Sequence, residues 1–215
     1  MTDKEKRKLV REDYNKIAQP YTKNFGDITQ FIPYIDEFAS GLKGNRVVDM
    51  GCGAGQVVNY LSGKGLKAIG VDFSKNLLKI AKSNYPKLKF VNKDILKFRP
   101  LRKFDGIITK YTLFHFSDND VQIVLSKFKN MLNPDGRLCV ILDVPSKDSE
   151  KIITEELDDR YKVYYNYMTP IKVEKLLTSA GFVVEKKTIV NVNKDALIYT
   201  SGIMVFQCGL KKIRS

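Results

Sequence analysis

A cluster of three glycines stands where a short apolar run ends, in the segment Gly51-Cys52-Gly53-Ala54-Gly55. Glycine lets a backbone turn sharply and approach a ligand closely, and a following helix offers free N–H groups. A dinucleotide fingerprint would need its third glycine one position later, at Gln56, so the pattern disfavours NAD and FAD. Asp72 follows Gly51 by 21 positions, at the end of the next apolar run, where a carboxylate can accept hydrogen bonds from both hydroxyls of a ribose. The segment and Asp72 together predict a site for a ligand that contains a nucleoside.

The elements that must position these residues alternate in their apolar periodicity, which is typical of an α/β fold with a mainly parallel sheet. Five short apolar runs bounded by turn-forming residues are predicted as strands buried on both faces: Arg46–Met50, Lys67–Val71, Lys89–Asn92, Asp105–Thr109 and Leu138–Leu142. Three segments with helical spacing lie between them: Gln56–Leu61, Ser74–Ser83 and Asn119–Leu132. Ser74 is the expected N-cap of the second helix, and Pro134-Asp135-Gly136 is expected to stop the third and form a turn.

The last third of the chain changes character. Thr169 and Pro170 are expected to open a helix as N-cap and first residue, and Gly181 to close it. Two strands follow near Phe182–Val190 and Ile203–Cys208. Because only the loop 191–201 separates them, this pair is predicted to be antiparallel at the end of the parallel sheet.

Length and composition bound the class of protein. The chain has 215 residues, of which 43% are hydrophobic, and this predicts one globular domain. It has no apolar run long enough for a membrane span, and its charged first twelve residues lack a secretory core, so we expect a cytoplasmic protein without membrane attachment. Three separate cysteines, Cys52, Cys139 and Cys208, fit neither a disulfide framework nor a metal site, and we expect them to be reduced and no metal to be bound.

The charge of the chain is uneven. The net charge is +13, which raises the question of a nucleic-acid partner, but only 8 of the 37 basic residues are arginine. Twelve basic residues and two acids lie between Ser62 and Lys103, whereas seven acids lie between Asp143 and Arg160. A ligand therefore meets two edges of different charge.

In its motifs the sequence resembles the class I S-adenosylmethionine-dependent methyltransferases, from Tyr14 to about Gln207. The segments that carry the resemblance, in chain order, are Tyr14–Tyr21, Asp49–Gly55, Gly70–Ser74, Val91–Ile95, Phe104–Ile108 with Leu113–Phe116, Met131–Leu138 and Leu176–Phe182. The resemblance implies a Rossmann-like fold whose seven-stranded sheet has the order 3-2-1-4-5-7-6, with the last strand antiparallel and helices on both faces. It also implies an N-terminal helical lid over residues 1–40, a core domain over 41–215, and an insertion at 143–168 on the acceptor side.

The cofactor implied by the resemblance is S-adenosylmethionine, with S-adenosylhomocysteine as product. Asp49 would hold the ammonium of the amino-acid tail, Asp72 the ribose and Asp94 the adenine amino group, while Phe73 and Ile95 would sandwich the ring. The remaining residues expected around the cofactor are Tyr14, Tyr21, Gly51, Cys52, Gly53, Gly55, Gln56 and Lys110.

Three features depart from the family pattern or allow two interpretations. Lys110 follows the fourth strand, where a cation beside a sulfonium is unfavourable, and we expect its ammonium to point to solvent. His115, the single histidine, is either a general base or a structural residue, and we favour the structural role. Tyr164, Tyr165 and Tyr167 either form an acceptor wall or simply pack in the fold; we treat them as candidate substrate-binding residues.

The sequence leaves the methyl acceptor open between three hypotheses. We favour a small molecule with an amine, a hydroxyl or a ring, because the acidic, tyrosine-rich segment would repel phosphates. RNA, such as tRNA, is the alternative that the net charge supports, but the basic run should lie at the far edge of the sheet. A cofactor-binding subunit that has lost catalysis is the third hypothesis, and the intact glycine segment argues against it.

Overall fold

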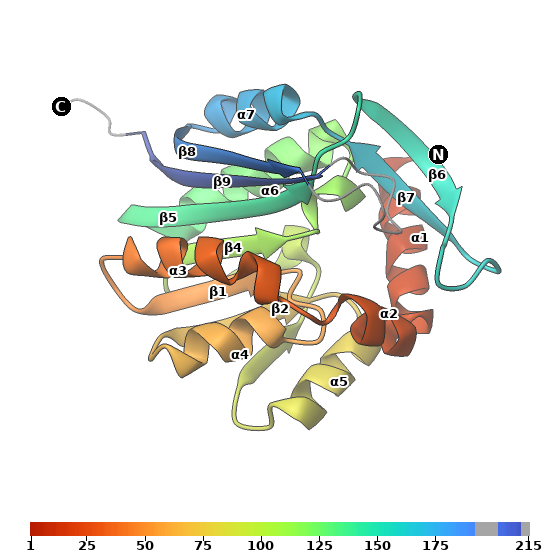
Figure 1. The fold of residues 1–215 in the computed structure, drawn as a ribbon, viewed down its shortest axis with the longest axis horizontal. Coiled ribbons are helices and arrows are strands. Elements are labelled where there is room, and N and C mark those ends of the chain that lie inside the picture. Colours follow the sequence, from red (N-terminus) through yellow and green to blue (C-terminus); the bar gives the residue numbers. More distant parts are fainter. Residues whose placement is uncertain (192–201, 212–215) are drawn as a thin grey trace.

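The computed structural model describes residues 1–191 and 202–211, and a seven-stranded sheet forms its centre (Figure 1). The strand order is β3-β2-β1-β4-β5-β9-β8. The pairs from β3 to β5 are parallel, and β9 runs antiparallel to both β5 and β8. Two further strands, β6 and β7, form a hairpin outside this sheet. When only the seven strands of the main sheet are numbered along the chain, their order across the sheet is 3-2-1-4-5-7-6. The predicted fold class is confirmed.

The elements of the N-terminal half begin with three helices and then alternate. Their bounds are α1 Asp3–Lys16, α2 Ala18–Phe25, α3 Ile32–Ser40, β1 Arg46–Met50, α4 Gln56–Gly63, β2 Lys67–Asp72, α5 Lys75–Asn84, β3 Lys89–Asn92 and β4 Phe104–Lys110. The bounds in the C-terminal half are α6 Asp118–Met131, β5 Leu132–Asp143, β6 Ser149–Thr154, β7 Lys162–Tyr167, α7 Pro170–Ser179, β8 Phe182–Asn191 and β9 Gly202–Leu210. Short 3-10 turns lie at Thr29–Phe31 (η1), Ile95–Lys97 (η2) and Leu113–His115 (η3).

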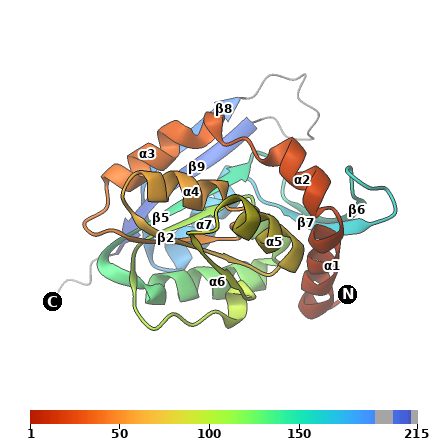
Figure 2. The same ribbon diagram turned by 90° about the horizontal axis from the view of Figure 1, so that it is seen from below.

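The central strands are buried on both faces, as their continuous apolar runs predict. Val47 and Ile108 pack against α3, α4 and α5 on one face, whereas Val48 and Ile107 pack against α6 and α7 on the other. Figure 2 shows α3 and α4 on the opposite side of the sheet from α6. Neighbouring residues of one strand thus enter different layers, because side chains alternate along a strand.

Most of the predicted helix caps and helix ends are confirmed. The Ser74 side chain accepts a hydrogen bond from the Leu77 N–H at the start of α5, and Thr169 does the same for Lys172 at the start of α7. Gly181, with φ +89°, follows Ala180, the C-cap residue of α7. The antiparallel pairing of the last two strands is confirmed, while the predicted loop between them falls, apart from its first residue, outside the described residues.

The turn predicted at Pro134-Asp135-Gly136 takes another form. The helix ends at Met131, but β5 begins at once, with Leu132 paired to Phe104 and Arg137 paired to Gly106. Four residues of β5 therefore lie opposite the single residue Asp105 of β4. The predicted turn is a bulge inside the strand, which absorbs the residues that could not continue a regular ladder.

The N-terminal segment, expected to be a helical lid, forms two helices, so Tyr14 and Tyr21 do not lie on one continuous helix. Ile17 separates α1 from α2. Pro20 explains the break, because its ring would collide with the Lys16 carbonyl in a continuous helix. The two tyrosine rings still meet, edge to face, with their centroids 5.0 Å apart.

The segment 143–168 contains the hairpin of β6 and β7, which forms a separate two-stranded sheet. Val163 and Tyr164 of β7 pack in one cluster with Val10 and Tyr14 of α1. Figure 1 accordingly places α1, α2 and the hairpin together at one end of the main sheet. Residues far apart in sequence are thus gathered beyond the ends of the central strands.

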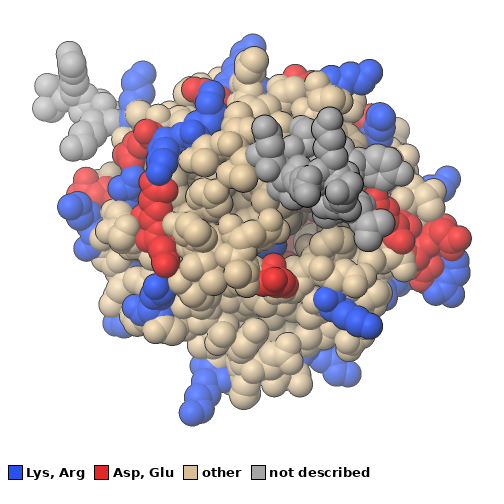
Figure 3. All heavy atoms as spheres, viewed as in Figure 1, with Lys and Arg blue, Asp and Glu red and all other residues tan. Residues whose placement is uncertain are grey.

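The basic run lies where the strand order predicts, around β2 and β3 at one edge of the sheet. Figure 3 shows lysine and arginine side chains spread around the viewed face instead of forming one patch, and the middle of that face is hollowed. Within the described residues, no helix is long and apolar enough to cross a membrane. All three cysteines are free and buried.

Candidate active site

The glycine segment leads from β1 into α4 through a loop with a left-handed backbone at Gly51, Gly53 and Gly55. Gly55, with φ +86°, is required by packing, because a Cβ there would lie 2.7 Å from the Phe90 ring. At Gly53, with φ +50°, a Cβ would meet no described atom within 4 Å. Gly53 therefore borders open space, where a ligand can come against the backbone.

Asp72 closes this loop from the end of β2. One carboxylate oxygen accepts a hydrogen bond from the Gly53 N–H at 2.9 Å, and the other accepts from the Ser74 N–H at 2.7 Å. Burial nevertheless raises the pKa of Asp72 to about 6, since it outweighs the backbone hydrogen bonds that favour the charged form. The carboxylate is thus fixed at the edge of the loop and has free lone pairs for hydroxyl donors.

Asp49 lies at the end of β1 and is 3% exposed. Among the described residues, no group donates a hydrogen bond to its Oδ1 atom. Burial raises the pKa of Asp49 to about 7, opposed by the nearby ammonium of Lys110. A buried carboxylate oxygen without a donor is unfavourable by itself, and it suits a ligand that carries an ammonium.

Lys110 does not point to solvent, and this expectation was wrong. Its ammonium lies 4.9 Å from the centre of the Phe31 ring and 4.7 Å from that of Tyr111. Burial lowers the pKa of Lys110 to about 8, although Asp49 and Asp143 favour the charged form. Aromatic faces and carboxylates replace the water that a solvent-directed lysine would use.

Two cavities meet at the glycine loop. One, of about 410 Å³, contains Asp49 and lies under α2; we call it the Asp49 cavity. The other, of about 340 Å³, contains Asp72, Phe73 and Leu77; we call it the Asp72 cavity. The residues that line both are Tyr21, Gly51, Gly53 and Lys110. A single elongated ligand can therefore run from Asp49 to Asp72 past the backbone of the loop.

Most residues predicted to bind the cofactor line these cavities. Tyr14, Phe73 and Asp72 belong to the Asp72 cavity, and Cys52 and Gln56 to the Asp49 cavity. The described residues that line the two cavities do not include Gly55, Asp94 or Ile95.

Asp94 and Ile95 have structural contacts that the motif did not reveal. The Asp94 carboxylate accepts a hydrogen bond from the Leu96 N–H at 2.8 Å and thereby caps η2. Ile95 is 1% exposed and packs in the core with Phe98. The Ile95 side chain points to that core, so the expected contact of this side chain with an adenine ring is not what the structure shows. The contact of Asp94 with the adenine stays a prediction.

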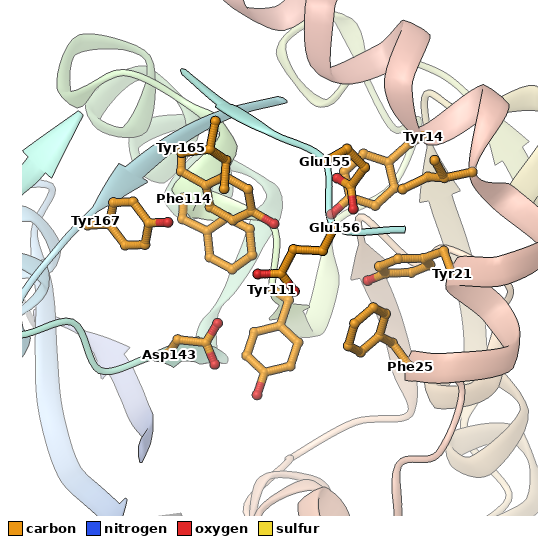
Figure 4. Close-up of a pocket in the computed structure, with 12 residues that line it drawn as sticks. Tyr14, Tyr21, Phe25, Tyr111, Phe114, Asp143, Glu155, Glu156, Tyr165 and Tyr167 are labelled. Atoms are coloured by element: carbon orange, nitrogen blue, oxygen red, sulfur yellow. The ribbon is translucent and has the colours of Figure 1, made fainter. Parts of the chain in front are cut away.

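A third cavity, of about 750 Å³, adjoins the other two between the N-terminal helices, the hairpin and the ends of β4 and β5; we call it the tyrosine cavity (Figure 4). Seven aromatic residues line it: Tyr14, Tyr21, Phe25, Tyr111, Phe114, Tyr165 and Tyr167. Three carboxylates, Asp143, Glu155 and Glu156, and two isoleucines, Ile17 and Ile153, complete the wall. Tyr14 and Tyr111 also line the Asp72 cavity, so the aromatic space opens onto the glycine loop.

The tyrosines of β7 divide between two sides of the hairpin. Tyr165 and Tyr167 stack with centroids 5.6 Å apart and face the tyrosine cavity. Tyr164 is 1% exposed, lies beneath the Lys6 ammonium and packs on α1, so its assignment to the acceptor wall was wrong. The reason is the alternation of side chains along a strand, which sends residue 164 to the face opposite 165.

His115 is buried and both ring nitrogens have partners. Nε2 lies 2.8 Å from the Tyr14 hydroxyl, and Nδ1 lies 3.0 Å from the Tyr164 carbonyl oxygen. A carbonyl only accepts, so Nδ1 carries the proton and the Tyr14 hydroxyl donates to Nε2. Burial lowers the pKa of His115 to about 4. The arrangement makes the ring a neutral connection between α1 and β7.

Three aromatic wall residues were not assigned a role from the sequence: Phe25, Tyr111 and Phe114. The signal for the last two was their place directly after the fourth strand, at the carboxyl edge where ligands bind in such sheets. Tyr111 also has φ +54°, an uncommon backbone conformation for a residue with a side chain and typical of functional sites. Phe25 had no such signal, because only the fold brings α2 to this edge.

Comparison with known proteins agrees with this geometry. The family of methyltransferase domains matches residues 47–136, from β1 into β5. An uncharacterized methyltransferase of Alkaliphilus oremlandii is 24% identical over 164 residues, which cover 70% of this chain and 76% of the relative.

Solved structures share the fold over nearly the whole chain. An S-adenosylmethionine-dependent methyltransferase from Clostridium acetobutylicum has a TM-score of 0.72 at 17% identity, covering 93% of this chain and all of the other. The 1,6-didemethyltoxoflavin-N1-methyltransferase of Burkholderia thailandensis has a TM-score of 0.78 at 18% identity, covering 99% and 92%. The magnesium protoporphyrin IX methyltransferase of Synechocystis, with a TM-score of 0.71 at 16% identity and 98% of each chain covered, was solved with bound SAM. Residues 47–136 thus match a methyltransferase domain, and the fold is that of S-adenosylmethionine-dependent methyltransferases.

Proposed function

We propose that this enzyme methylates a small molecule that carries an aromatic ring or an amine and binds in the tyrosine cavity. One observation carries the proposal: a largely aromatic cavity opens onto the glycine loop through Tyr14, Tyr21 and Tyr111. Such walls suit a flat apolar molecule, and the three carboxylates of the wall disfavour a phosphate backbone.

The residues of the two smaller cavities fit the cofactor. Asp49 offers a buried oxygen without a donor to the tail ammonium, Asp72 offers lone pairs to the ribose hydroxyls, and Gly53 leaves room for close approach. When bound, S-adenosylmethionine supplies an activated methyl group on a cationic sulfur. Because the Asp49 and Asp72 cavities share Tyr21, Gly53 and Lys110, these residues would surround that sulfur.

The protein's own contribution is to aim the acceptor and to exclude water. An acceptor lone pair must come within about 3 Å of the methyl carbon, in line with the bond that breaks. The aromatic walls would hold the acceptor in this direction, and Tyr14 is held by its hydrogen bond to His115. In this proposal His115 is a positioning residue and not the base, because both of its ring nitrogens are already used.

The N-terminal helices would act as the lid over this site. α2 lies over the Asp49 cavity, while α1 packs on the hairpin and contributes Tyr14 to the tyrosine cavity. Closing these helices would shield the transfer from water.

A methyl-transfer assay tests the acceptor class. Labelled S-adenosylmethionine is incubated with the enzyme and either a small-molecule extract or total RNA, and label is counted in each fraction. We expect label in the small-molecule fraction and weak dependence on salt. Transfer to RNA, with a rate that falls steeply with salt as counterion release predicts, would instead support the alternative acceptor.

A further inference from the structure

Two buried carboxyl groups face each other behind the wall of the tyrosine cavity. Asp13 of α1 is 2% exposed and Glu155, in the loop after β6, is 9% exposed. Within the described residues, neither oxygen of Asp13 accepts a hydrogen bond from a donor group. Burial and the Glu155 carboxylate raise the pKa of Asp13 to about 8, so the pair is held together by an Asp13 carboxyl proton.

Within the described residues, no basic side chain forms an ion pair with Asp13 or Glu155. Other acids nearby are paired: Glu150 with Lys6, and Asp158 with Arg160. In the part of the chain that the structure describes, no lysine or arginine lies within 4.0 Å of the carboxylate of Asp13, Glu155 or Glu156. The basic residue with the largest effect on Asp13 is Lys16, which is exposed and lies over the Tyr161 ring.

The pair is accessible from the cavity through Glu155. Glu155 and Glu156 both line the tyrosine cavity, and Figure 4 shows Glu155 beside Tyr14 with Glu156 extending toward Tyr111. The rings of Tyr21 and Phe25 form the adjoining wall. Carboxylates beside aromatic faces attract a cation both by charge and by the negative face of the ring.

We propose that Glu155, backed by Asp13, is the anchor for a positively charged nitrogen of the methyl acceptor. This inference rests on the proposed function and narrows it to an aromatic or apolar molecule that carries an ammonium. A protonated nitrogen has no lone pair, so the ammonium at Glu155 is not the atom that receives the methyl group. The acceptor atom is a second group, which the anchor places toward the glycine loop.

Binding of such a cation releases a proton. A positive charge at Glu155 favours the ionised form of Asp13 and lowers its pKa. Between pH 7 and 8 Asp13 then passes on binding from mainly protonated to mainly ionised, whereas its neighbour Asp158, whose pKa is lowered by Arg160, stays ionised. A neutral ligand of the same shape leaves the proton in place.

Calorimetry with matched ligand pairs tests this. The probes are 2-phenylethylamine with 2-phenylethanol, and 2-(1-naphthyl)ethylamine with 2-(1-naphthyl)ethanol, each titrated into enzyme saturated with S-adenosylhomocysteine at pH 7.5. Repeating each titration in phosphate and in Tris buffer gives the number of protons released. We expect each amine to bind about tenfold or more tightly than its alcohol, with release of about half a proton.

Variants separate the anchor from the rest of the cavity. Glu155→Gln is expected to remove the preference for the amines while the alcohols still bind, and Asp13→Asn to remove the proton release. Glu150→Gln, in the same hairpin but outside the cavity wall, is the control and should behave as wild type.

Two outcomes would overturn the inference in distinguishable ways. If the alcohols bind as tightly as the amines, the cation anchor is wrong while the small-molecule function stands. If neither class binds and labelled methyl groups appear only in RNA, the proposed function is wrong and the anchor with it.

Discussion

The two halves of the site are built by different means. The donor half is centred on one glycine loop and on the two strand ends that carry Asp49 and Asp72, which are close in sequence. The acceptor half gathers side chains from α1, α2, the ends of β4 and β5 and the hairpin. Backbone conformation shapes the first, whereas aromatic rings and carboxylates shape the second. A common cofactor is therefore recognised by geometry that short motifs reveal, and the acceptor by surfaces that only the fold assembles.

The largest expected effect is a loss of cofactor affinity when the ligand can no longer come close to the backbone at Gly53 in the donor half. Gly53→Ala puts a methyl group into the open space beside the loop and strains a left-handed backbone by about 1 kcal/mol. The folded protein should tolerate this, but cofactor affinity should fall by about a hundredfold or more because the methyl group occupies the ligand's place. Titration calorimetry with S-adenosylmethionine measures the loss.

Gly63→Ala is the matched control, since a Cβ there also meets no described atom within 4 Å but the backbone is helical. It should bind the cofactor as wild type does. Equal binding by Gly53→Ala and Gly63→Ala would show that the donor half is not defined by backbone approach.

Asp72→Ala should weaken S-adenosylmethionine by about 1–3 kcal/mol, because buried hydroxyl donors of the ligand would lose their acceptor. Calorimetric titration measures the difference. Saturating cofactor, at about a hundred times its dissociation constant, should stabilise the wild type by about 2.7 kcal/mol. Unchanged affinity in the variant would remove Asp72 from the ribose position, and stabilisation by NADH instead would contradict the assignment of the cofactor.

The pH dependence of cofactor binding tests the role of Asp49. Only the ionised carboxylate attracts the tail ammonium, and the pKa of Asp49 in the empty protein is about 7. Affinity should therefore be constant well above pH 7 and fall by up to about tenfold for each pH unit below it, more steeply below pH 6, where Asp72 also takes up a proton. In Asp49→Asn the fall near pH 7 should vanish. A profile that is flat from pH 8 to 6 in the wild type would separate Asp49 from the ammonium.

The substitution His115→Asn tests the contact of His115 with Tyr14, which lines both the Asp72 cavity and the tyrosine cavity. The ring is neutral at physiological pH, with a pKa of about 4, and holds the Tyr14 hydroxyl. An asparagine keeps a hydrogen-bonding side chain, so turnover should stay within about tenfold of wild type. A loss of about a hundredfold with unchanged cofactor affinity would make His115 the general base.

The smallest change is expected in the dynamics of the acceptor half. Hydrogen exchange over residues 10–25 should slow when the cofactor binds, because this segment contributes Tyr21 to the cofactor cavities. The basic edge around β3 serves as the internal reference and should not change. Equal exchange with and without cofactor would mean that α1 and α2 are fixed packing elements and not a lid.

The contrast between local backbone patterns and surfaces assembled by the fold also explains which features the sequence could predict. The strands, the glycine loop and the position of Asp72 followed from local patterns with strict backbone requirements, whereas the sheet order followed from the family resemblance. Lys110 was misplaced because the rings of Phe31 and Tyr111, from distant segments, replace its solvent. The direction of the Ile95 side chain likewise could not be predicted, because it is set by packing against core residues that come together only in the folded chain.

Two further features of the structure had signals in the sequence itself. The alternation along a strand separates Tyr164 from Tyr165, and Pro20 forbids one helix through Ile17. The Asp13–Glu155 pair had no such signal, since nothing local connects a residue of the first helix with one 142 positions later.

The hairpin of β6 and β7 has a consequence for how this enzyme can diverge. Within the described residues its strands hydrogen-bond to each other and not to the main sheet. Insertions, deletions or exchanges in it would leave the register of the seven-stranded sheet, and with it the donor half, intact. New acceptor ranges can thus arise, by natural drift or by laboratory grafting of hairpins, without rebuilding the machinery that presents the methyl group.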